Sequence, residues 1–210
     1  MEGERQSTPP SLVGDDKGQE GLLVTIHTID IIPEPLSLLK LAPQVNINGQ
    51  VNFGTIRGKI FMKQPNPDLD IAGENIRING LPIIERTGLY GDGFLKFTFQ
   101  RTEESGLITF SIEDAKLKGA LPGLGVLPLN VFKSVRGLVT IGDTVNVDSL
   151  AFEGKGIYAR IKGKIKESRF DGNIEMMIDS SFELHAMVES VLERYKISAG
   201  YYVIPYTQKI

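Results

Sequence analysis

Residues 153–165 read EGKGIYARIKGKI, and this stretch decides the fold because apolar and polar residues alternate along it. From position 157 onward the odd positions are apolar or small, and the even positions are mostly basic. The odd positions hold Ile157, Ala159, Ile161, Gly163 and Ile165, and the even ones hold Tyr158, Arg160, Lys162, Lys164 and Lys166. A period of two is typical of a β-strand with one buried face. Burying one apolar side chain contributes about 1.5–3 kcal/mol, so the odd face is the expected reason for the stretch.

The residues that follow predict a partner for this strand. The dipeptide Asp171-Gly172 is typical of a tight hairpin turn. After it, NIEMMID (173–179) alternates again and places Ile174, Met176 and Ile178 on one side. We therefore expect a long antiparallel hairpin.

An earlier segment follows the same pattern. IRGKI (56–60) is similar to IKGKI (161–165), and Ile56, Ile60 and Met62 share one side. The Asn-Gly dipeptide at 48–49 predicts the turn before it. Other short alternating segments are separated by turn signals at 91–93, 103–106 and 142–144. Many short strands with short turns predict a mainly β fold, a long antiparallel meander sheet.

Two helices are expected beside the sheet. Prolines bound PEPLSLLKLAP (33–43) and limit this short helix near the N-terminus to about two turns. SSFELHAMVESVLERYK (180–196) predicts an amphipathic C-terminal helix, in which Ser180 and Glu183 fit a capping box. Its apolar stripe is Leu184, Met187, Val188, Val191, Leu192 and Tyr195.

Composition bounds the domain organisation and the partners. The chain has 210 residues and a formal net charge of −3. Residues 1–20 are polar, so we expect a disordered tail there and a single β-rich domain over residues 21–210. Acidic and basic residues balance within that domain, which argues against nucleic acid as a partner. The chain has no cysteine, which excludes disulfides and thiolate metal sites. It shows no signal peptide and no run of apolar residues long enough for a membrane span.

Four interpretations compete for the basic face formed by Tyr158, Arg160, Lys162, Lys164 and Lys166. A phosphate loop is excluded, because Gly163-Lys164 is followed by isoleucine rather than serine or threonine. Tyr158 could stack a nucleic-acid base, which the balanced charge disfavours. A solvated strand face, whose lysines discourage edge-to-edge pairing, is the simplest interpretation. Attraction to anionic lipid head groups, or to a protein partner, is the functional alternative.

No residue pattern indicates catalysis. The two histidines, His27 and His185, stand apart and lack acids at metal-ligand spacing. GALPGLGVLPLN (119–130) contains no dinucleotide fingerprint, and we interpret it as an apolar connection between sections of the sheet. We expect no enzyme activity, no metal and no cofactor.

One passage carries a resemblance to a known family. LPLNVFKSVRGLVTIGDTVNVDSLAFEGKGIYARIKGKI (127–165) has an apolar lead-in, a GDT turn, an L-x-F-E-G strand and an A-x-I-K-G-K-I strand, and the chain closes on GYYVIPY (200–206). This order resembles the C-terminal half of the type II secretion system protein N family and looks like the wider AsmA-like envelope proteins. The resemblance covers roughly residues 35–210 and is carried by strands and glycines rather than by a catalytic signature.

The resemblance implies a location and two functions. Such proteins are usually anchored in the bacterial inner membrane by an N-terminal helix, which this chain lacks, with the β body in the periplasm. The first expected function is a non-catalytic component of the type II secretion system that contacts other envelope proteins. The alternative is an AsmA-like module that binds or transfers phospholipid along a long, bent sheet with an apolar inner face. Either a lipid groove or a closed core would be lined by Ile56, Ile60, Met62, Ile157, Ile161, Ile165, Ile174, Met176 and Ile178, and the sequence leaves this choice open.

Overall fold

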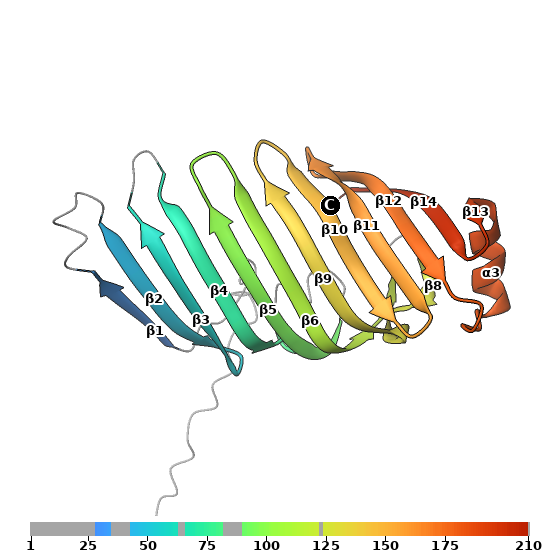
Figure 1. Ribbon diagram of the computed structural model, residues 1–210, viewed down its shortest axis with the longest axis horizontal. Helices are drawn as coiled ribbons and strands as arrows, with labels where there is room; N and C mark the ends of the chain where they lie inside the picture. Colours follow the sequence, from blue (N-terminus) through green and yellow to red (C-terminus); the bar gives the residue numbers. More distant parts are fainter. Residues whose placement is uncertain (1–27, 35–42, 63–65, 82–89, 122–123, 210) are drawn as a thin grey trace, which may run out of the picture.

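Strands that follow one another in the sequence lie side by side in one large antiparallel sheet (Figure 1). The structure is a computed structural model that describes residues 28–34, 43–62, 66–81, 90–121 and 124–209. The sheet has twelve strands in the order β1-β2-β3-β4-β5-β6-β9-β10-β11-β12-β14-β13. This confirms the mainly β fold and the antiparallel meander that the alternating segments predict.

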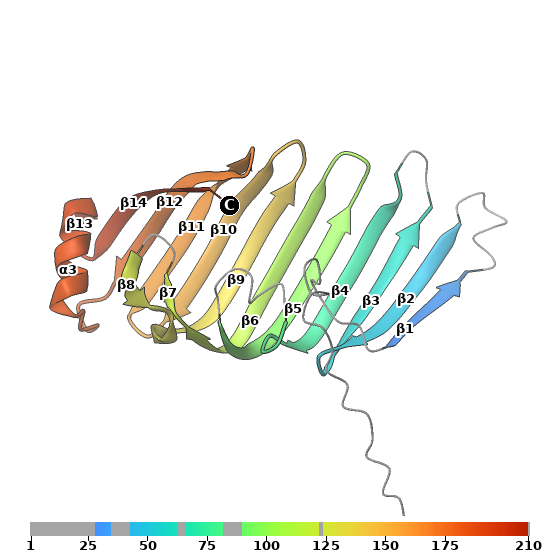
Figure 2. The same cartoon turned by 180° about the vertical axis from the view of Figure 1, so that it is seen from behind.

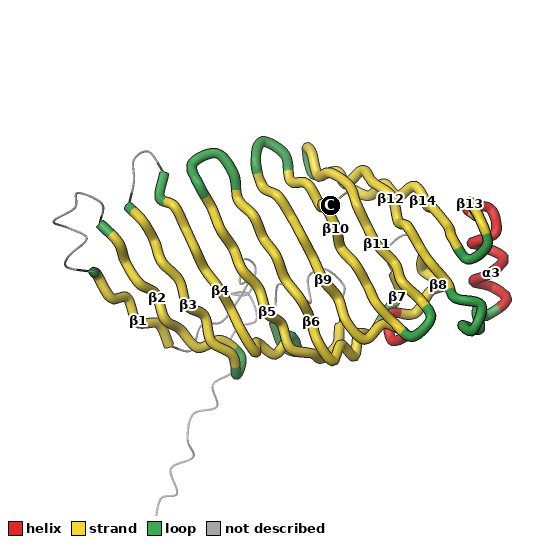
Figure 3. The backbone as a smooth tube through the Cα atoms, in the orientation of Figure 1, coloured by secondary structure: helices red, strands yellow, loops and turns green. Residues whose placement is uncertain are grey.

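The strands are long for a globular protein, and short connections join most of them (Figure 3). Their bounds are β1 Thr28–Pro33, β2 Gln44–Val51, β3 Gly54–Phe61, β4 Asp68–Arg77, β5 Tyr90–Arg101, β6 Gly106–Lys118, β9 Phe132–Ile141, β10 Val145–Gly154, β11 Ile157–Lys166, β12 Arg169–Ile178, β13 Lys196–Ser198 and β14 Tyr201–Lys209.

An excursion interrupts the meander between β6 and β9. It contains the two-stranded pair β7 (Ala120–Leu121) and β8 (Leu124–Pro128) and the 3-10 turn η2 (Leu129–Val131). The sheet is bent, and this excursion lies against one of its faces (Figure 2). The expected connection over 119–130 is therefore a short second layer, and its leucines are the reason: Leu121, Leu127 and Leu129 are all buried.

Two hairpin turns lie elsewhere than the sequence predicts. Asn48-Gly49 is inside β2 and Asp171-Gly172 is inside β12, so both expected turns are wrong. The hairpins instead close at Asn52-Phe53 and Glu167-Ser168, where all four residues have positive φ. Two positive φ values suit the right-handed twist of the flanking strands. The register of the apolar face fixes these turns even though neither contains a glycine.

The other three turn signals have mixed outcomes. The signal at 103–106 overlaps the loop 102–105 between β5 and β6, and the signal at 142–144 is the loop between β9 and β10, as expected. The Gly-Asp-Gly signal at 91–93 lies inside β5, where the register shifts between Asp92 and Phe94. The flexible glycines there form an irregularity in the strand rather than a turn.

The C-terminal helix is present but shorter than its apolar stripe predicts. Helix α3 spans Ala186–Leu192 and continues as the 3-10 turn η3 (Glu193–Tyr195). The capping-box prediction is wrong, because the N-cap is His185, whose Nδ1 accepts a hydrogen bond from the Met187 N–H at 3.3 Å. The expected disordered tail lies outside the described residues. So do residues 35–42 of the expected helix over 33–43, and its first residue, Pro33, ends β1.

Candidate functional site

The strand register places the apolar residues of the sheet on one face, which we call the apolar face. Ile161 lies opposite Leu150 on one side and Ile174 on the other, and Ile174 lies opposite Ile204. The same row continues through the neighbouring strands as Gly137, Phe110, Phe97, Gly73, Ile56 and Gly49. Since directly opposite residues share a face, the apolar surface runs without a break across ten strands.

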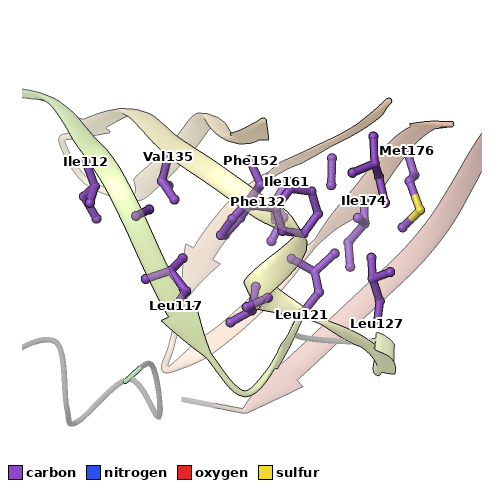
Figure 4. Packing of buried hydrophobic residues seen from close by; sticks show 14 of the residues in the cluster. Ile112, Leu117, Leu121, Leu127, Phe132, Val135, Phe152, Ile161, Ile174 and Met176 are labelled. Atoms are coloured by element: carbon purple, nitrogen blue, oxygen red, sulfur yellow. The ribbon is translucent and has the colours of Figure 1, made fainter. Parts of the chain in front are cut away.

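One part of the apolar face is buried, and we call it the covered row. It consists of Ile112, Val135, Phe152, Ala159 and Met176, which are directly opposite one another in successive strands and are at most 7 % exposed. Leucines from the end of β6 and the β7–β8 layer pack near this row (Figure 4). Val188 and Leu192 of α3 are buried in the same cluster. This part of the sheet has an ordinary closed core.

A second row of apolar residues crosses the same face, nearer the other ends of the strands. Its residues are only half-buried, and we call it the open row. It consists of Ile71, Phe99, Ile108, Val139 and Val147, which are again directly opposite one another. Val147, at one end of this row, packs against the buried cluster, and the other four residues are half-buried. In the described part of the chain, β7 and β8 lie in front of one part of the sheet, and α3 lies at its end beside β13 (Figure 2). The open row is therefore an apolar strip on the same face as the core.

The predicted apolar residues divide between these environments. Ile157, Ile161, Ile174 and Met176 are buried in the core, with exposed fractions of 5 % or less. Ile56, Ile165 and Ile178 are partly buried and pack against that core, and Ile60 is half-buried. Met62 differs: it follows the end of β3 and is 53 % exposed, so it does not line the core. One part of the apolar face is thus a closed core, and another part of the same face is only half-buried.

An apolar crevice opens where the second layer meets the segment before α3. It has a volume of about 560 Å³, and Leu127, Val131, Phe182, Leu184 and Val188 form much of its apolar wall. Glu183 and His185 stand among the lining residues and give the crevice a polar margin. This crevice is a hollow beside the buried cluster, and it is large enough to admit a hydrocarbon chain.

Phenylalanine rings fill the places on the apolar face where glycine provides no side chain. Phe97 lies opposite Gly73, and Phe110 lies opposite Gly137. The ring of Phe170 reaches the Gly163–Gly172 pair, so that a Cβ on Gly163 would lie 2.6 Å from its Cζ. These glycines let the rings lie close to the sheet and keep the apolar face continuous.

The opposite face is polar, and its basic residues are partly neutralised. Arg160 lies opposite Glu175, and its Nε donates a hydrogen bond to Glu175 Oε2 at 3.0 Å. Lys162 Nζ lies 3.3 Å from Glu175 Oε1. The hydrogen bond from Arg160 is the main cause that holds the pKa of the Glu175 carboxyl below its usual value.

In the rest of the predicted basic face, acidic residues on the neighbouring strand offset part of the positive charge. Tyr158 lies opposite Met177, and Lys164 lies opposite Asp171. Lys166 lies opposite another cation, Arg169, whose Nε donates to Asp171 Oδ1 at 3.1 Å. The predicted residues thus form an ordered cross-strand pattern, in which Glu175 and Asp171 offset much of the positive charge.

The described residues contain no group of three or more His, Cys, Asp or Glu side chains that could hold a metal ion. His185 is engaged as the α3 N-cap, and His27 lies outside the described residues. No helix in the described ranges is long and apolar enough to cross a membrane.

Comparisons with protein families, with curated proteins and with solved structures found no match to this chain. The candidate site therefore depends on the geometry of the chain itself. Sequence reasoning missed the open row, although Phe99, Ile108, Val139 and Val147 each stand in an alternating segment. It also missed the second layer, for which the repeated leucines of residues 119–130 were the available signal.

Proposed function

We propose that this protein is a non-catalytic component of the bacterial cell envelope that binds the acyl chains of a phospholipid on its apolar face. The observation that carries the proposal is the open row, a half-buried apolar strip that runs beside a closed core on the same face. Neighbouring strands lie about 4.8 Å apart, so the ten strands of the apolar surface give it a length of about 43 Å. Each methylene buried on such a face contributes about 0.8 kcal/mol.

The position of the second layer supports this proposal. A protein whose sheet served only as a scaffold would gain stability by covering the whole apolar face. Here Val139 of β9 is half-buried, while Val135 of the same strand is only 3 % exposed. The apolar crevice next to α3 offers a second place where a chain could enter beside the core.

The other function expected from the sequence, a type II secretion component that acts through protein contacts, stays the second proposal. It calls for an exposed surface that a partner covers, and the polar face offers exposed apolar side chains at Leu107, Leu138 and Met177. The two proposals differ in whether the purified protein carries lipid.

The test uses the full chain purified from a bacterial envelope, with native mass spectrometry and organic extraction. Uptake of a fluorescent phospholipid from phosphatidylethanolamine–phosphatidylglycerol vesicles is measured alongside. We expect bound phospholipid at about one or more per chain, and we expect Val139→Asp to lose it at least tenfold. Leu138→Asp is the matched control, because Leu138 is the preceding residue of β9 and faces the other side of the sheet.

Thermal unfolding of both variants verifies that they are folded. If Val139→Asp does not fold, Ile108→Ser takes its place, since Ile108 lies opposite Val139 and is also half-buried. A lipid-free protein that takes up no vesicle lipid would overturn the lipid proposal and favour the protein-contact one. Equal loss of lipid in Val139→Asp and Leu138→Asp would overturn the assignment to the apolar face.

A further inference from the structure

The two ends of the twelve-stranded sheet differ. At one end, β13 has only three residues, Lys196–Ser198, and its register with β14 is irregular. At the other end, β1 is six residues long, and all six are exposed. Native edge strands are usually protected by lysines, bulges or short length. Among the described residues, β1 pairs only with β2, contains no lysine and has a regular register.

The backbone of β1 has a defined pattern of groups that no other described strand pairs. The Glu34 N–H donates to the Gln44 carbonyl at 3.0 Å. Because alternate residues of a strand bond to the same neighbour, this contact shows that the even-numbered residues of β1 are the ones bonded to β2. Asp30 and Ile32 therefore direct their N–H and C=O groups toward β2. Ile29 and Ile31 direct theirs away from the sheet, where no described strand lies. Pro33 has the same outward parity and lacks an N–H, which is the position where an edge strand tolerates proline.

The side chains of β1 are also unusual for an edge. Ile29 and Ile31 extend the apolar face, because they lie opposite Gly49 and Ile47. They are 50 % and 62 % exposed, and Ile32 on the other face is 52 % exposed. A regular strand with exposed isoleucines on both faces, and with backbone groups that no described strand pairs, is a template for another strand.

We propose that β1 pairs antiparallel with β1 of a second copy of this chain, with Ile31 of each copy opposite Ile31 of the other. A second copy fits this edge because β1 is complementary to itself: on the apolar face, an antiparallel pair of β1 strands sets isoleucine and proline against isoleucine and proline. β13 is too short to serve as the partner in a head-to-tail arrangement. The remaining arrangement between identical chains is a symmetric one, in which the same edge is used twice. Its two-fold axis passes midway between the two Ile31 residues, perpendicular to the sheet, and keeps both apolar faces on the same side.

The register follows from the residues of β1. In an antiparallel pair opposite residues share a face, so Ile29 and Ile31 must meet odd-numbered residues. Centring the pair on Ile31 joins two outward-directed backbones, which exchange two hydrogen bonds, and it places Ile29 opposite Pro33. Centring it on Asp30 would set two carboxylates directly opposite each other, which is destabilising. The Ile31 register instead places Asp30 opposite Ile32.

A single introduced cysteine tests this register, because the chain has no cysteine of its own. Under mild oxidation we expect Ile31→Cys to form a disulfide-linked dimer. Ile29→Cys is the matched control on the same strand and the same face. In the proposed register its two copies lie four residues apart, about 13 Å along the strands, which is beyond the reach of a disulfide.

Light scattering over a range of protein concentrations tests the association itself. We expect the unmodified full chain to form a dimer, and we expect Ile31→Lys to raise its dissociation constant at least tenfold. Met187→Lys, at a residue of α3 that is 62 % exposed, serves as the control and should leave the dimer unchanged. A monomer at every concentration would overturn the proposal, and equal cross-linking of Ile29→Cys and Ile31→Cys would overturn the register. These readouts do not depend on lipid, so they can fail or succeed independently of the proposed function.

Discussion

The ring of Phe110 lies so close to Gly137, its direct cross-strand partner, that a Cβ on Gly137 would overlap the ring. Three ring atoms would be involved, and even the farthest would be only 2.7 Å away. The glycine thus allows an aromatic ring to lie flat on the sheet, next to Leu150 in the same row. This contact is one reason why the apolar face stays continuous between the core and the open row.

The first prediction follows from this contact. Gly137→Ala should lower the free energy of unfolding by about 1–3 kcal/mol, because the added methyl group forces Phe110 out of its position. Gly125→Ala is the control, since no atom lies within 4 Å of the added Cβ there, and it should change the free energy by less than about 0.5 kcal/mol. Chemical denaturation measures both. The double variant Phe110→Leu/Gly137→Ala should lose less than the sum of its parts, and strict additivity would contradict the account.

A second prediction concerns the hairpin turn between β2 and β3. Phe53 has a φ of 71° and is 88 % exposed, so its side chain gains little from packing while its backbone is strained. Phe53→Gly should therefore raise the free energy of unfolding by about 1 kcal/mol. Thr55→Gly, two residues later in β3, should instead lower it, because glycine weakens a strand. A destabilised Phe53→Gly variant would show that Phe53 packs against something.

The third prediction concerns pH. The pKa of Glu175 is lowered from its usual value of 4.5, chiefly by the hydrogen bond from Arg160. The folded state therefore binds this proton less tightly than the unfolded state. The resulting stability is present above the unfolded pKa and is lost as pH falls through the folded pKa.

Glu175→Gln should destabilise the protein at pH 7 by about 1–3 kcal/mol. Below pH 4.5 the difference between variant and wild type should shrink and then vanish, as thermal unfolding in a series of buffers would show. Glu193→Gln is the control, because Glu193 pairs with Lys196 on an exposed surface, where such pairs contribute little. A difference for Glu175→Gln that stays constant down to the lowest pH would refute the assignment.

The fourth prediction tests the second layer. Leu192 of α3 is fully buried in the cluster that closes the covered row. Leu192→Ala should lower the free energy of unfolding by about 2–5 kcal/mol, because it leaves a cavity. Met187→Ala on the same helix should have almost no effect, since Met187 is 62 % exposed. Equal effects in the two variants would mean that α3 does not pack into this cluster.

The comparison between sequence and structure is instructive at particular residues. The alternation in residues 157–178 predicts the β11–β12 hairpin and the shared face of Ile161, Ile174 and Met176, because a period of two fixes which side chains face the core. The dipeptides Asn48-Gly49 and Asp171-Gly172 mislead, since both lie inside strands. Gly172 supplies space for the ring of Phe170 rather than turn flexibility.

Other features depend on contacts that no local pattern reports. The start of α3 at His185 depends on how the preceding segment packs at Phe182 and Leu184. The division of the apolar face into a covered row and an open row depends on where the β7–β8 layer lies. A covered part and an open part of the apolar face look alike in sequence, because both carry apolar residues at the same spacing.

The meander order of the strands bears on how the chain reaches its folded state. From β1 to β6 each strand finds its partner in the strand that precedes it in the sequence, so every step pairs neighbouring segments of the chain. Assembly can therefore advance from the N-terminal end while synthesis continues, one hairpin at a time. Joining β9 to β6 must wait for the intervening excursion, and β14 must pass α3 before it reaches β12. The C-terminal third is thus expected to be the last part of the sheet to form.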